Sequence, residues 1–192
     1  QIISNNYFHL AYPWFAAINT PDIFNICAGS MAGSFGAPIN STNCYQYPRS
    51  GDGYAGFANY YTISAVTEFP EVKLNEKLKK GKRYFISLYV NAANCSNPDI
   101  CYSDGMALAF SDTAYTTVVQ PADEVIPPFT PVVSNPSGNL LKDTLGWMEI
   151  SGCYLAKGDE QYLIIGNFKT SAETHSEGCV GVTGSYYYLD DV

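Results

Sequence analysis

Charge is scarce in this chain of 192 residues, where Asp, Glu, Lys and Arg together make up only 15%. The charge that is present is mainly acidic, with 10 Lys and Arg against 18 Asp and Glu and a formal net charge of −8. A surface of that sign repels phosphate backbones, so we expect no nucleic-acid partner. No apolar run is long enough to cross a bilayer either, and we expect no membrane span.

The sequence also lacks a persuasive amphipathic helix. It has instead 16 Tyr, 16 Gly and 11 Pro, a composition that favours strands and turns. Apolar and polar residues alternate most clearly in 83–91 and in 105–113. We interpret these two runs as an antiparallel pair at the centre of the fold, with an apolar face toward the core and a mixed face free for function.

About eight to ten such strands, separated by turn signals, predict an all-β fold. Residues 121–136 contain five prolines, which suit an edge strand or a connection that crosses the molecule. No internal repeat interrupts the pattern. We therefore predict a single domain over residues 1–192, a jelly-roll β-sandwich with loops stapled by disulfides.

Six cysteines, an even number, indicate disulfides and an oxidising compartment. A zinc site is the weaker reading, because the chain has no CxxC pair and His9 and His175 lie far from any cysteine cluster. The sequence leaves many pairings open, and local pairing across loops is the simplest. It predicts the bridges Cys27–Cys44, Cys95–Cys101 and Cys153–Cys179.

Several short motifs occur in a characteristic order along almost the whole chain. They are 11–15 (AYPWF), 20–25 (TPDIFN), 48–57 (PRSGDGYAGF), 78–90 (LKKGKRYFISLYV), 109–113 (AFSDT), 139–147 (NLLKDTLGW), 165–168 (IGNF) and 186–192 (YYYLDDV). Together they resemble the carbohydrate-binding-module-like jelly-roll domains at the front of secreted and outer-membrane proteins of gliding, type 9-secreting bacteria. Those domains often precede OmpA-like or sorting domains, so the resemblance implies that this chain is the N-terminal part of a longer protein.

The resemblance implies a secreted or cell-surface protein without catalytic activity. The leading hypothesis is a recognition or adhesion module that binds glycans or surface polymers. The alternative is a structural subunit of a surface filament or of a secretion-associated assembly, which binds other protein chains. A glycoside hydrolase comes third.

The resemblance also implies a structural calcium site near the last strand. Asp191 would be a ligand, and Asp52, Asn5 and loop carbonyls would supply further oxygens. The family's opening motif carries an acid where this chain has His9, which weakens that expectation. The other reading of Asp191 is a carboxylate that caps loop amides.

The mixed face of run 83–91 is the expected binding surface. Phe85 and Tyr89 share it, and Ala107 and Ala109 would border it if 105–113 were the neighbouring strand. Burial of the aromatics under another layer is the alternative. Aromatic and polar residues expected around this face are Tyr45 and Tyr47 as a wall, Trp14 as a partly exposed ring, and Asn91 and Arg49 as groups that orient a sugar.

No spacing singles out a catalytic site. Asp190 and Asp191 are neighbours on an expected strand, so their carboxylates should point to opposite faces and not share a substrate. His175 has serine and acids beside it, but neighbours within one loop do not make a triad. Apart from catalysis, Thr113 and Thr144 each follow an Asp and precede an apolar residue, which is the acceptor pattern for O-glycans that the bacterial resemblance implies.

Overall fold

The structure is a computed structural model. It describes residue 8 and residues 11–31, 35–40, 44–62, 67–93, 101–117, 124–179 and 184–192, and the statements below concern this part of the chain.

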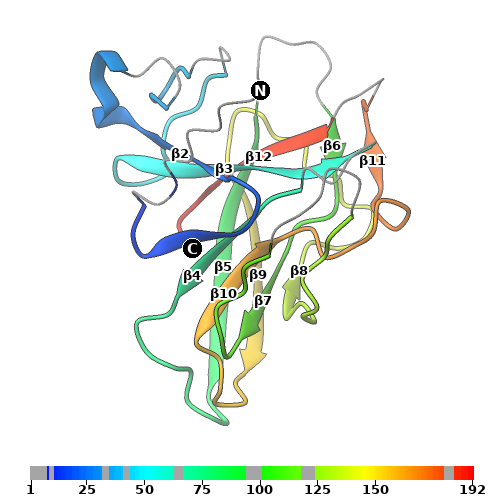
Figure 1. Cartoon of the computed structure of the whole chain (residues 1–192). Helices are drawn as coiled ribbons and strands as arrows, with labels where there is room; N and C mark the ends of the chain where they lie inside the picture. Colours follow the sequence, from blue (N-terminus) through cyan, green and yellow to red (C-terminus); the bar gives the residue numbers. More distant parts are fainter. Residues whose placement is uncertain are drawn as a thin grey trace.

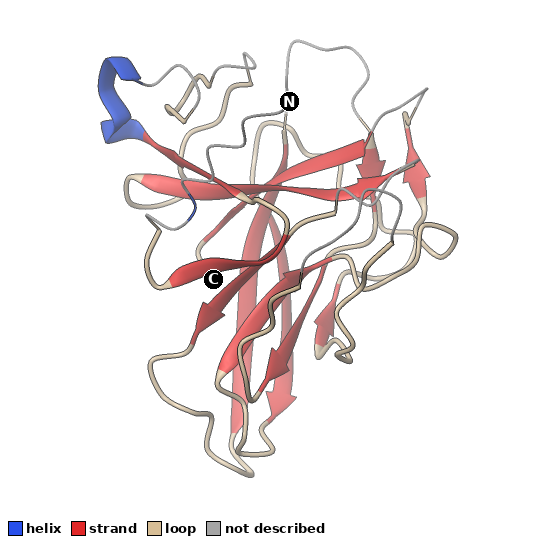
Figure 2. Cartoon of the chain, viewed as in Figure 1, coloured by secondary structure: helices blue, strands red, loops and turns tan. Residues whose placement is uncertain are grey.

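Two five-stranded sheets, in which every pair of neighbours is antiparallel, form a β-sandwich (Figures 1 and 2). The first sheet has the order β1-β4-β10-β7-β8 and the second has the order β2-β3-β12-β5-β9. Their strands are β1 (Trp14–Ile18), β2 (Asp22–Asn25), β3 (Gly53–Tyr61), β4 (Phe69–Lys73), β5 (Arg83–Ala92), β7 (Ala107–Ser111), β8 (Val133–Ser134), β9 (Met148–Leu155), β10 (Tyr162–Gly166) and β12 (Gly184–Asp190). A small pair, β6 (Tyr102–Ser103) with β11 (Ser176–Glu177), and the short 3-10 helix η2 (Ile26–Met31) complete the described elements. The predicted all-β jelly-roll sandwich is confirmed.

The predicted pairing of 83–91 with 105–113 is wrong. Both runs are strands, but β5 lies in the second sheet between β12 and β9, and β7 lies in the first sheet between β10 and β8. They face each other across the core. The two runs share a period of two, and that period does not record which strands are neighbours.

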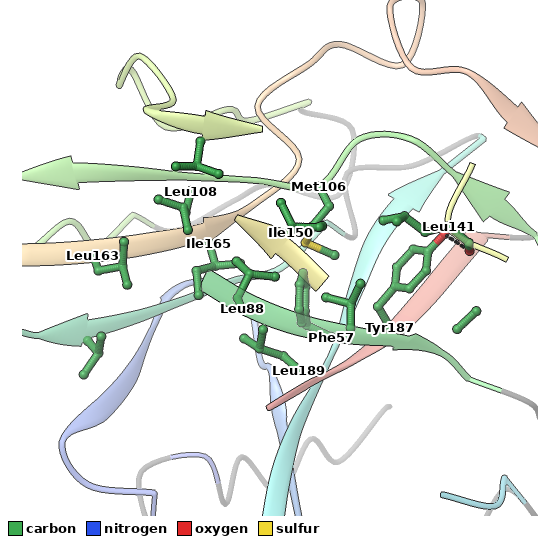
Figure 3. Close-up of a cluster of buried hydrophobic side chains, with 14 residues drawn as sticks. Phe57, Leu88, Met106, Leu108, Leu141, Ile150, Leu163, Ile165, Tyr187 and Leu189 are labelled. Carbon is green, nitrogen blue, oxygen red and sulfur yellow. Dashed lines mark hydrogen bonds between the residues drawn. The ribbon is translucent and has the colours of Figure 1, made fainter. Parts of the chain in front are cut away.

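The main core lies between the sheets (Figure 3). Leu88 and Val90 of β5 meet Leu108 of β7 and Ile165 of β10, and all four side chains are fully buried. Each such side chain contributes about 1.5–3 kcal/mol of transfer free energy. The alternate residues of these strands point away from the core, so each sheet also has an outer face. That face can bind a ligand only where no other segment covers it.

The outer face of the first sheet is covered. Ile164 of β10 and Ile18 of β1 are buried there in a second cluster, against Tyr115, Phe129 and other partly buried side chains. Ala107 and Ala109, which we expected to border a groove, are buried. The proline-rich segment supplies Phe129 and the edge strand β8, which confirms its predicted role as edge strand and connection.

The predicted disulfide pairing is also wrong. Cys101 is bonded to Cys179 across 78 residues, and this bond ties the β6–β11 pair together. Cys27 and Cys153 are free and exposed thiols. Cys44 is disulfide-bonded, but its partner is not Cys27, and Cys95 lies outside the described residues. Local pairing failed because strands distant in the sequence are neighbours in a sandwich.

Candidate functional site

An aromatic cluster occupies one half of the outer face of the second sheet. Phe24 of β2, Tyr54 of β3 and Tyr188 of β12 pack with ring centroids 4.8–5.3 Å apart. Residues 35–40 and 44–48 cover them: Asn40 Nδ2 donates to the Tyr188 hydroxyl over 2.9 Å, and the Tyr54 hydroxyl donates to the Gln46 carbonyl over 3.0 Å. Burial raises the pKa of both tyrosines, so they act as neutral core residues here.

The end of this loop is held by the two carboxylates that close β12. The amides of Arg49 and Ser50 donate to Asp190 Oδ2 over 2.7 and 3.3 Å. The Arg49 guanidinium and the Ser50 hydroxyl both bind the Asp191 carboxylate. Asp191 has a φ of 49°, so the backbone turns out of the strand there. Our expectation that the two carboxylates point apart is therefore wrong, because β12 ends between them.

The anchored turn places Arg49 over Tyr89. The guanidinium carbon lies 3.5 Å from the centroid of the Tyr89 ring, a cation–π contact. The same guanidinium is paired with Asp191, so its charge is neutralised locally and its plane is fixed. Tyr89 is thereby oriented by a residue that comes from a different part of the sequence.

Below Arg49 the outer face of the second sheet is uncovered by any described residue. Tyr89, Ser87 and Phe85 of β5 lie opposite Glu149, Ser151 and Cys153 of β9. These six residues are termed the outer strip. Four of them, Phe85, Glu149, Ser151 and Cys153, are exposed, and Phe85 is 68% exposed. The strip combines two rings roughly 13 Å apart along β5 with hydroxyl and carboxylate groups beside them.

Tyr45 and Tyr47 are two exposed aromatic residues a few positions before Arg49. They are 51% and 56% exposed, and their rings meet edge to face with centroids 5.7 Å apart. Both come from the stretch that covers the aromatic cluster and leads into Arg49. The structure thus leaves the two tyrosines that we expected to form a wall available to a ligand.

Two of the residues expected at the binding face have structural surroundings instead. Asn91 is fully buried, and its Nδ2 atom lies 2.7 Å from the Gly146 carbonyl oxygen and 3.3 Å from that of Asp143. It fixes the loop before β9 and has no surface to offer a sugar, so its predicted binding role is wrong. Trp14 packs against the main core from β1, and its intermediate burial agrees with the expected partly exposed ring.

The residues expected to hold calcium are only partly brought together. Asp191 is paired with Arg49, Asp52 is an exposed turn residue, and Asn5 lies outside the described residues. In the described part of the chain no group of three His, Cys, Asp or Glu side chains is placed to hold a metal ion. Calcium binding stays a prediction from the resemblance. The loop amides are capped by Asp190 and not by Asp191, whose carboxylate binds the side chains of Arg49 and Ser50.

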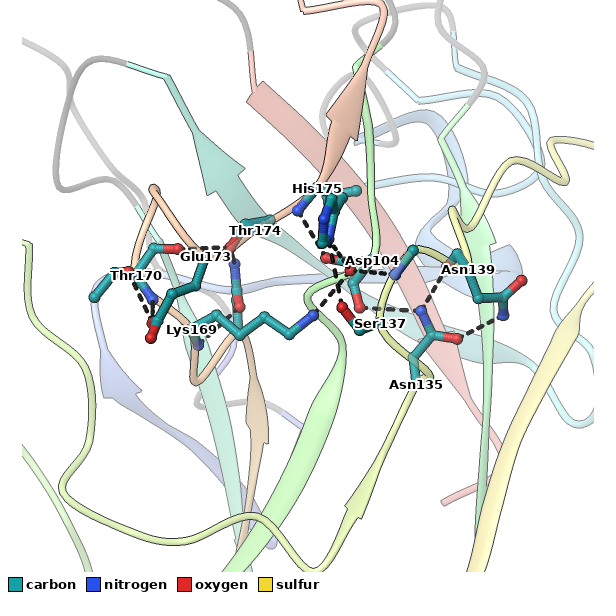
Figure 4. Close-up of polar contacts among 12 residues, drawn as sticks. Asp104, Asn135, Ser137, Asn139, Lys169, Thr170, Glu173, Thr174 and His175 are labelled. Atoms are coloured by element: carbon teal, nitrogen blue, oxygen red, sulfur yellow. Dashed lines mark hydrogen bonds and ion pairs between the residues drawn. The ribbon is translucent and has the colours of Figure 1, made fainter.

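A polar network around Asp104 is a feature that the sequence did not reveal (Figure 4). Asp104 is fully buried, and its Oδ2 atom lies 2.9 Å from Lys169 Nζ and 3.0 Å from His175 Nδ1. Ser137 Oγ lies 3.5 Å from that same ring nitrogen. A Ser-His-Asp relay needs the serine and the carboxylate on opposite ring nitrogens, so this arrangement is structural.

The two threonines expected to carry O-glycans have different surroundings. Thr113 is exposed in the turn after β7, where its hydroxyl donates to Asp112 Oδ1 over 3.3 Å. Thr144 is half-buried in the loop before β9. Modification at either position stays a prediction.

Sequence reasoning missed the β9 half of the outer strip. Glu149, Ser151 and Cys153 alternate with Ile150, which is buried. That alternation was the available signal. It could not reveal that β9 is the neighbour of β5, because the β5–β9 register depends on the whole sheet.

No protein-family model and no curated protein matches this sequence. One similar solved structure contains the CBM22-1 and GH10 modules of endo-1,4-beta-D-xylanase 10B from Clostridium thermocellum, complexed with xylohexaose. It has a TM-score of 0.44 at 12% identity, and the match covers 93% of this chain and 25% of that chain. Another, described as "CBM4 structure and function", has a TM-score of 0.36 at 15% identity and covers 90% of this chain and 84% of that one. Likeness at this level transfers no ligand to this chain.

Within the described residues, no helix has the length and apolar character needed to span a membrane.

Proposed function

We propose that this chain is a non-catalytic module that binds glycans on the outer strip and on the neighbouring Tyr45 and Tyr47. The observation that carries the proposal is the pairing of exposed aromatic rings with fixed polar groups on a rigid sheet. The C–H face of a sugar ring stacks on a π surface, while carboxylate and hydroxyl groups beside it accept and donate hydrogen bonds.

The strip is preorganised for such a ligand. Tyr89 is fixed under Arg49, and Glu149 lies directly opposite Tyr89 on β9. Two strands that are paired over their full shared length hold these side chains, so little conformational entropy remains to be lost on binding. Phe85, at 68% exposed, contributes little to the core and has an uncovered ring face.

A secreted location is consistent with glycan binding. The Cys101–Cys179 disulfide is typical of proteins that fold in an oxidising compartment, where extracellular glycans are the available polymers. Outer-membrane association, gliding motility and type 9 secretion are supported by the sequence motifs alone.

A structural subunit of a surface assembly is the second candidate. The observation that favours it is the cluster of exposed apolar side chains on the strip and at its end, Phe85, Cys153 and Leu155. An aromatic anchor in that position would serve a protein partner as well as a sugar. The two candidates differ in what Tyr89 and Glu149 bind.

The test is a glycan array followed by calorimetry on the best oligosaccharide. We expect Tyr89→Ala to weaken binding by about 1–3 kcal/mol with the fold retained, as removal of an aromatic anchor should. Tyr12→Ala is the matched control, because Tyr12 is 91% exposed and lies outside the strip. The array should be silent if the chain is an assembly subunit, and unfolding of the Tyr89→Ala variant would show that Tyr89 is a core residue.

A further inference from the structure

Among the described residues, one edge of β5 has no partner strand over its first half. β12 pairs with β5 only from Tyr187 opposite Ala92 to Asp190 opposite Tyr89. β9 pairs with the other edge along the whole strand, from Arg83 to Val90. Figure 1 shows β5 and β9 continuing well beyond the end of β12. The free edge therefore runs along residues 83–88, roughly 20 Å of backbone.

The direction of the backbone groups on this edge follows from the bonds at the two ends of β5. Ala93 N donates to Tyr186 O on β12, and Lys82 O accepts from Ala156 N at the end of β9. The backbone N–H and C=O groups of the odd-numbered residues of β5 therefore point toward β12, and those of the even-numbered residues point toward β9. In the part of β5 that precedes Tyr89, the N–H and C=O groups of Phe85 and Ser87 therefore lie on the free edge. No hydrogen bond from a described residue reaches them.

An apolar cleft lies beside the same edge. Its volume is about 410 Å³, and it opens between the sheets where β12 has ended. Trp14, Leu74, Ile86 and Phe110 line it, and each is a partly buried member of the main core. Lys73, Asn75, Tyr84 and Ser87 are also among the lining residues, so polar groups border this apolar part of the cleft.

The walls of this cleft are fixed by the backbone. The β4–β5 loop is tied to the turn before β10 by two bonds, Leu74 N to Gln161 O at 2.8 Å and Leu78 N to Glu160 O at 3.1 Å. Tyr84, which also lines the cleft, accepts a bond of 2.9 Å from Lys79 N on its hydroxyl. Hydrogen bonds therefore fix the walls of the cleft at this end of the sandwich.

Most of the positive charge of this acidic protein lies in residues 73–83, which lead into the free edge, and Lys73 of this segment lines the cleft. Ten Lys and Arg occur in the chain, and the six within residues 73–83 all belong to the end of β4, the loop or the start of β5. They are Lys73, Lys77, Lys79, Lys80, Lys82 and Arg83. All of these side chains are exposed.

We propose that this edge binds an extended peptide, which adds as an antiparallel strand beside residues 83–88 and occupies the place that β12 leaves. Strand addition satisfies free edge groups with backbone bonds, and pockets beside the edge select alternate side chains. Residues of the added strand that bond Phe85 and Ser87 have outward side chains, because paired residues share a face. The residues between them point into the cleft and are therefore apolar. The end of the peptide near Arg83 is acidic, because residues 73–83 are rich in exposed Lys and Arg.

The probe is a peptide of about eight residues that alternates threonine and valine and ends in two aspartates. The protein carries Trp147→Phe, so that Trp14 reports on the cleft by fluorescence, and amide exchange of Phe85 and Ser87 is followed by NMR. We expect saturable quenching of Trp14 together with slower exchange at both amides. Lys73→Glu should weaken binding severalfold, and the control Lys142→Glu, far along the chain and paired with Glu177, should leave it unchanged.

Two N-methylated versions of the peptide separate strand addition from simple apolar binding. Methylation of the threonine amides blocks the edge that faces β5 and should weaken binding about tenfold or more, while methylation of the valine amides should change it less than about threefold. Equal binding of both versions would overturn the proposal. Failure of the unmodified peptide to bind would also overturn the proposal. Dodecanoate is tested as an apolar ligand without backbone amides, and binding of dodecanoate without binding of the peptide counts as the same failure. Glycan binding is measured in a separate experiment without peptide, because Phe85 and Ser87 belong to the outer strip and also line the cleft.

Discussion

At the scale of single residues, two buried carboxyls stand out because no cation neutralises them in the described contacts. Glu71 of β4 is fully buried and accepts bonds of 3.1 and 3.2 Å from Tyr115 N. Glu68 accepts from Ala58 N over 2.7 Å, next to the register shift in the β3–β12 pairing. Burial outweighs these bonds and raises the pKa of each carboxyl to about 7. Both therefore favour the neutral form in the folded protein.

Glu71→Gln tests this assignment. A carboxyl whose folded pKa is raised to about 7 contributes stability below its unfolded pKa of 4.5 and loses that contribution as the pH rises through 7. The substitution should remove pH dependence on the order of 3 kcal/mol between about pH 4.5 and pH 8. Urea unfolding at a series of pH values measures it. An unchanged slope of stability against pH would contradict the raised pKa.

Gly56 is a second residue whose role is local. It lies on β3 opposite Asp22 of β2 and Tyr188 of β12, and an added Cβ would meet Phe24 Cε2 and the Tyr186 hydroxyl at 2.6 Å each. The Tyr186 hydroxyl also donates to Asp22 over 2.6 Å, so it is not free to move aside. The glycine is thus required by close packing of rings.

We expect Gly56→Ala to destabilise the protein by about 1–3 kcal/mol through overpacking. Gly152→Ala in the same sheet is the comparison, since the atoms nearest its added Cβ belong to the Val133 side chain, the closest at 3.0 Å. Thermal unfolding of the two variants gives the difference. Equal losses at both positions would argue against a specific clash at Gly56.

At the scale of elements, the β6–β11 pair depends on contacts distant in the sequence. The Cys101–Cys179 bond closes a long stretch of chain, and Asp104 binds His175 N over 3.0 Å and Gly138 N over 2.7 Å. The bonds of Asp104 join its own segment to those that carry Gly138 and His175, and Figure 4 shows Asp104 and His175 side by side. The small pair contains only two residues on each strand, too few to be stable by themselves.

Removal of this disulfide by Cys101→Ser with Cys179→Ser should cost about 2–5 kcal/mol in the free energy of unfolding, because the unfolded chain regains loop entropy. Cys153→Ser is the matched control and should be neutral, since Cys153 is free and exposed. Denaturant unfolding compares the three proteins. A large loss on Cys153→Ser would mean that this thiol is also bonded.

At the scale of the whole molecule, carboxyls with raised and lowered pKa values oppose each other. Glu68 and Glu71, with raised pKa values, stabilise the folded protein at acidic pH, as described above. Burial by itself raises the pKa of Glu160, but bonds from the Tyr154 hydroxyl and from the amides of Lys157 and Gly158 lower it to about 2. The pKa of Asp104 is also lowered, because the bonds from Gly138, Lys169 and His175 together outweigh its burial.

Together, these raised and lowered pKa values predict that the folded protein is most stable in mild acid, near pH 4.5–5. Glu160 contributes stability above its unfolded pKa of 4.5, and this contribution is lost as the pH falls toward 2. Glu68 and Glu71 contribute below 4.5 and lose their contribution as the pH rises toward 7. Melting temperatures from about pH 3 to pH 9 should therefore pass through a maximum. A maximum in the alkaline range would contradict the balance.

The sequence alone determined the class of the fold. Alternation in 83–91 correctly placed Leu88 and Val90 in the core and Phe85 and Tyr89 on the other face, because a period of two is a property of a single strand. Proline in 121–136 correctly limited that segment to an edge and a connection, since proline cannot donate to a ladder. Exposed Tyr45 and Tyr47 followed from their place in a long polar loop.

Only the tertiary structure decided which segments are neighbours. β5 pairs with β9 and β12 and not with β7, Cys101 bonds to Cys179, and Arg49 stacks on Tyr89. Asn91 looked like a surface donor but is buried against the loop before β9. Each of these contacts joins residues far apart in the chain. Their partners are selected by the packing of two sheets around one core, and no local pattern of residues encodes that choice.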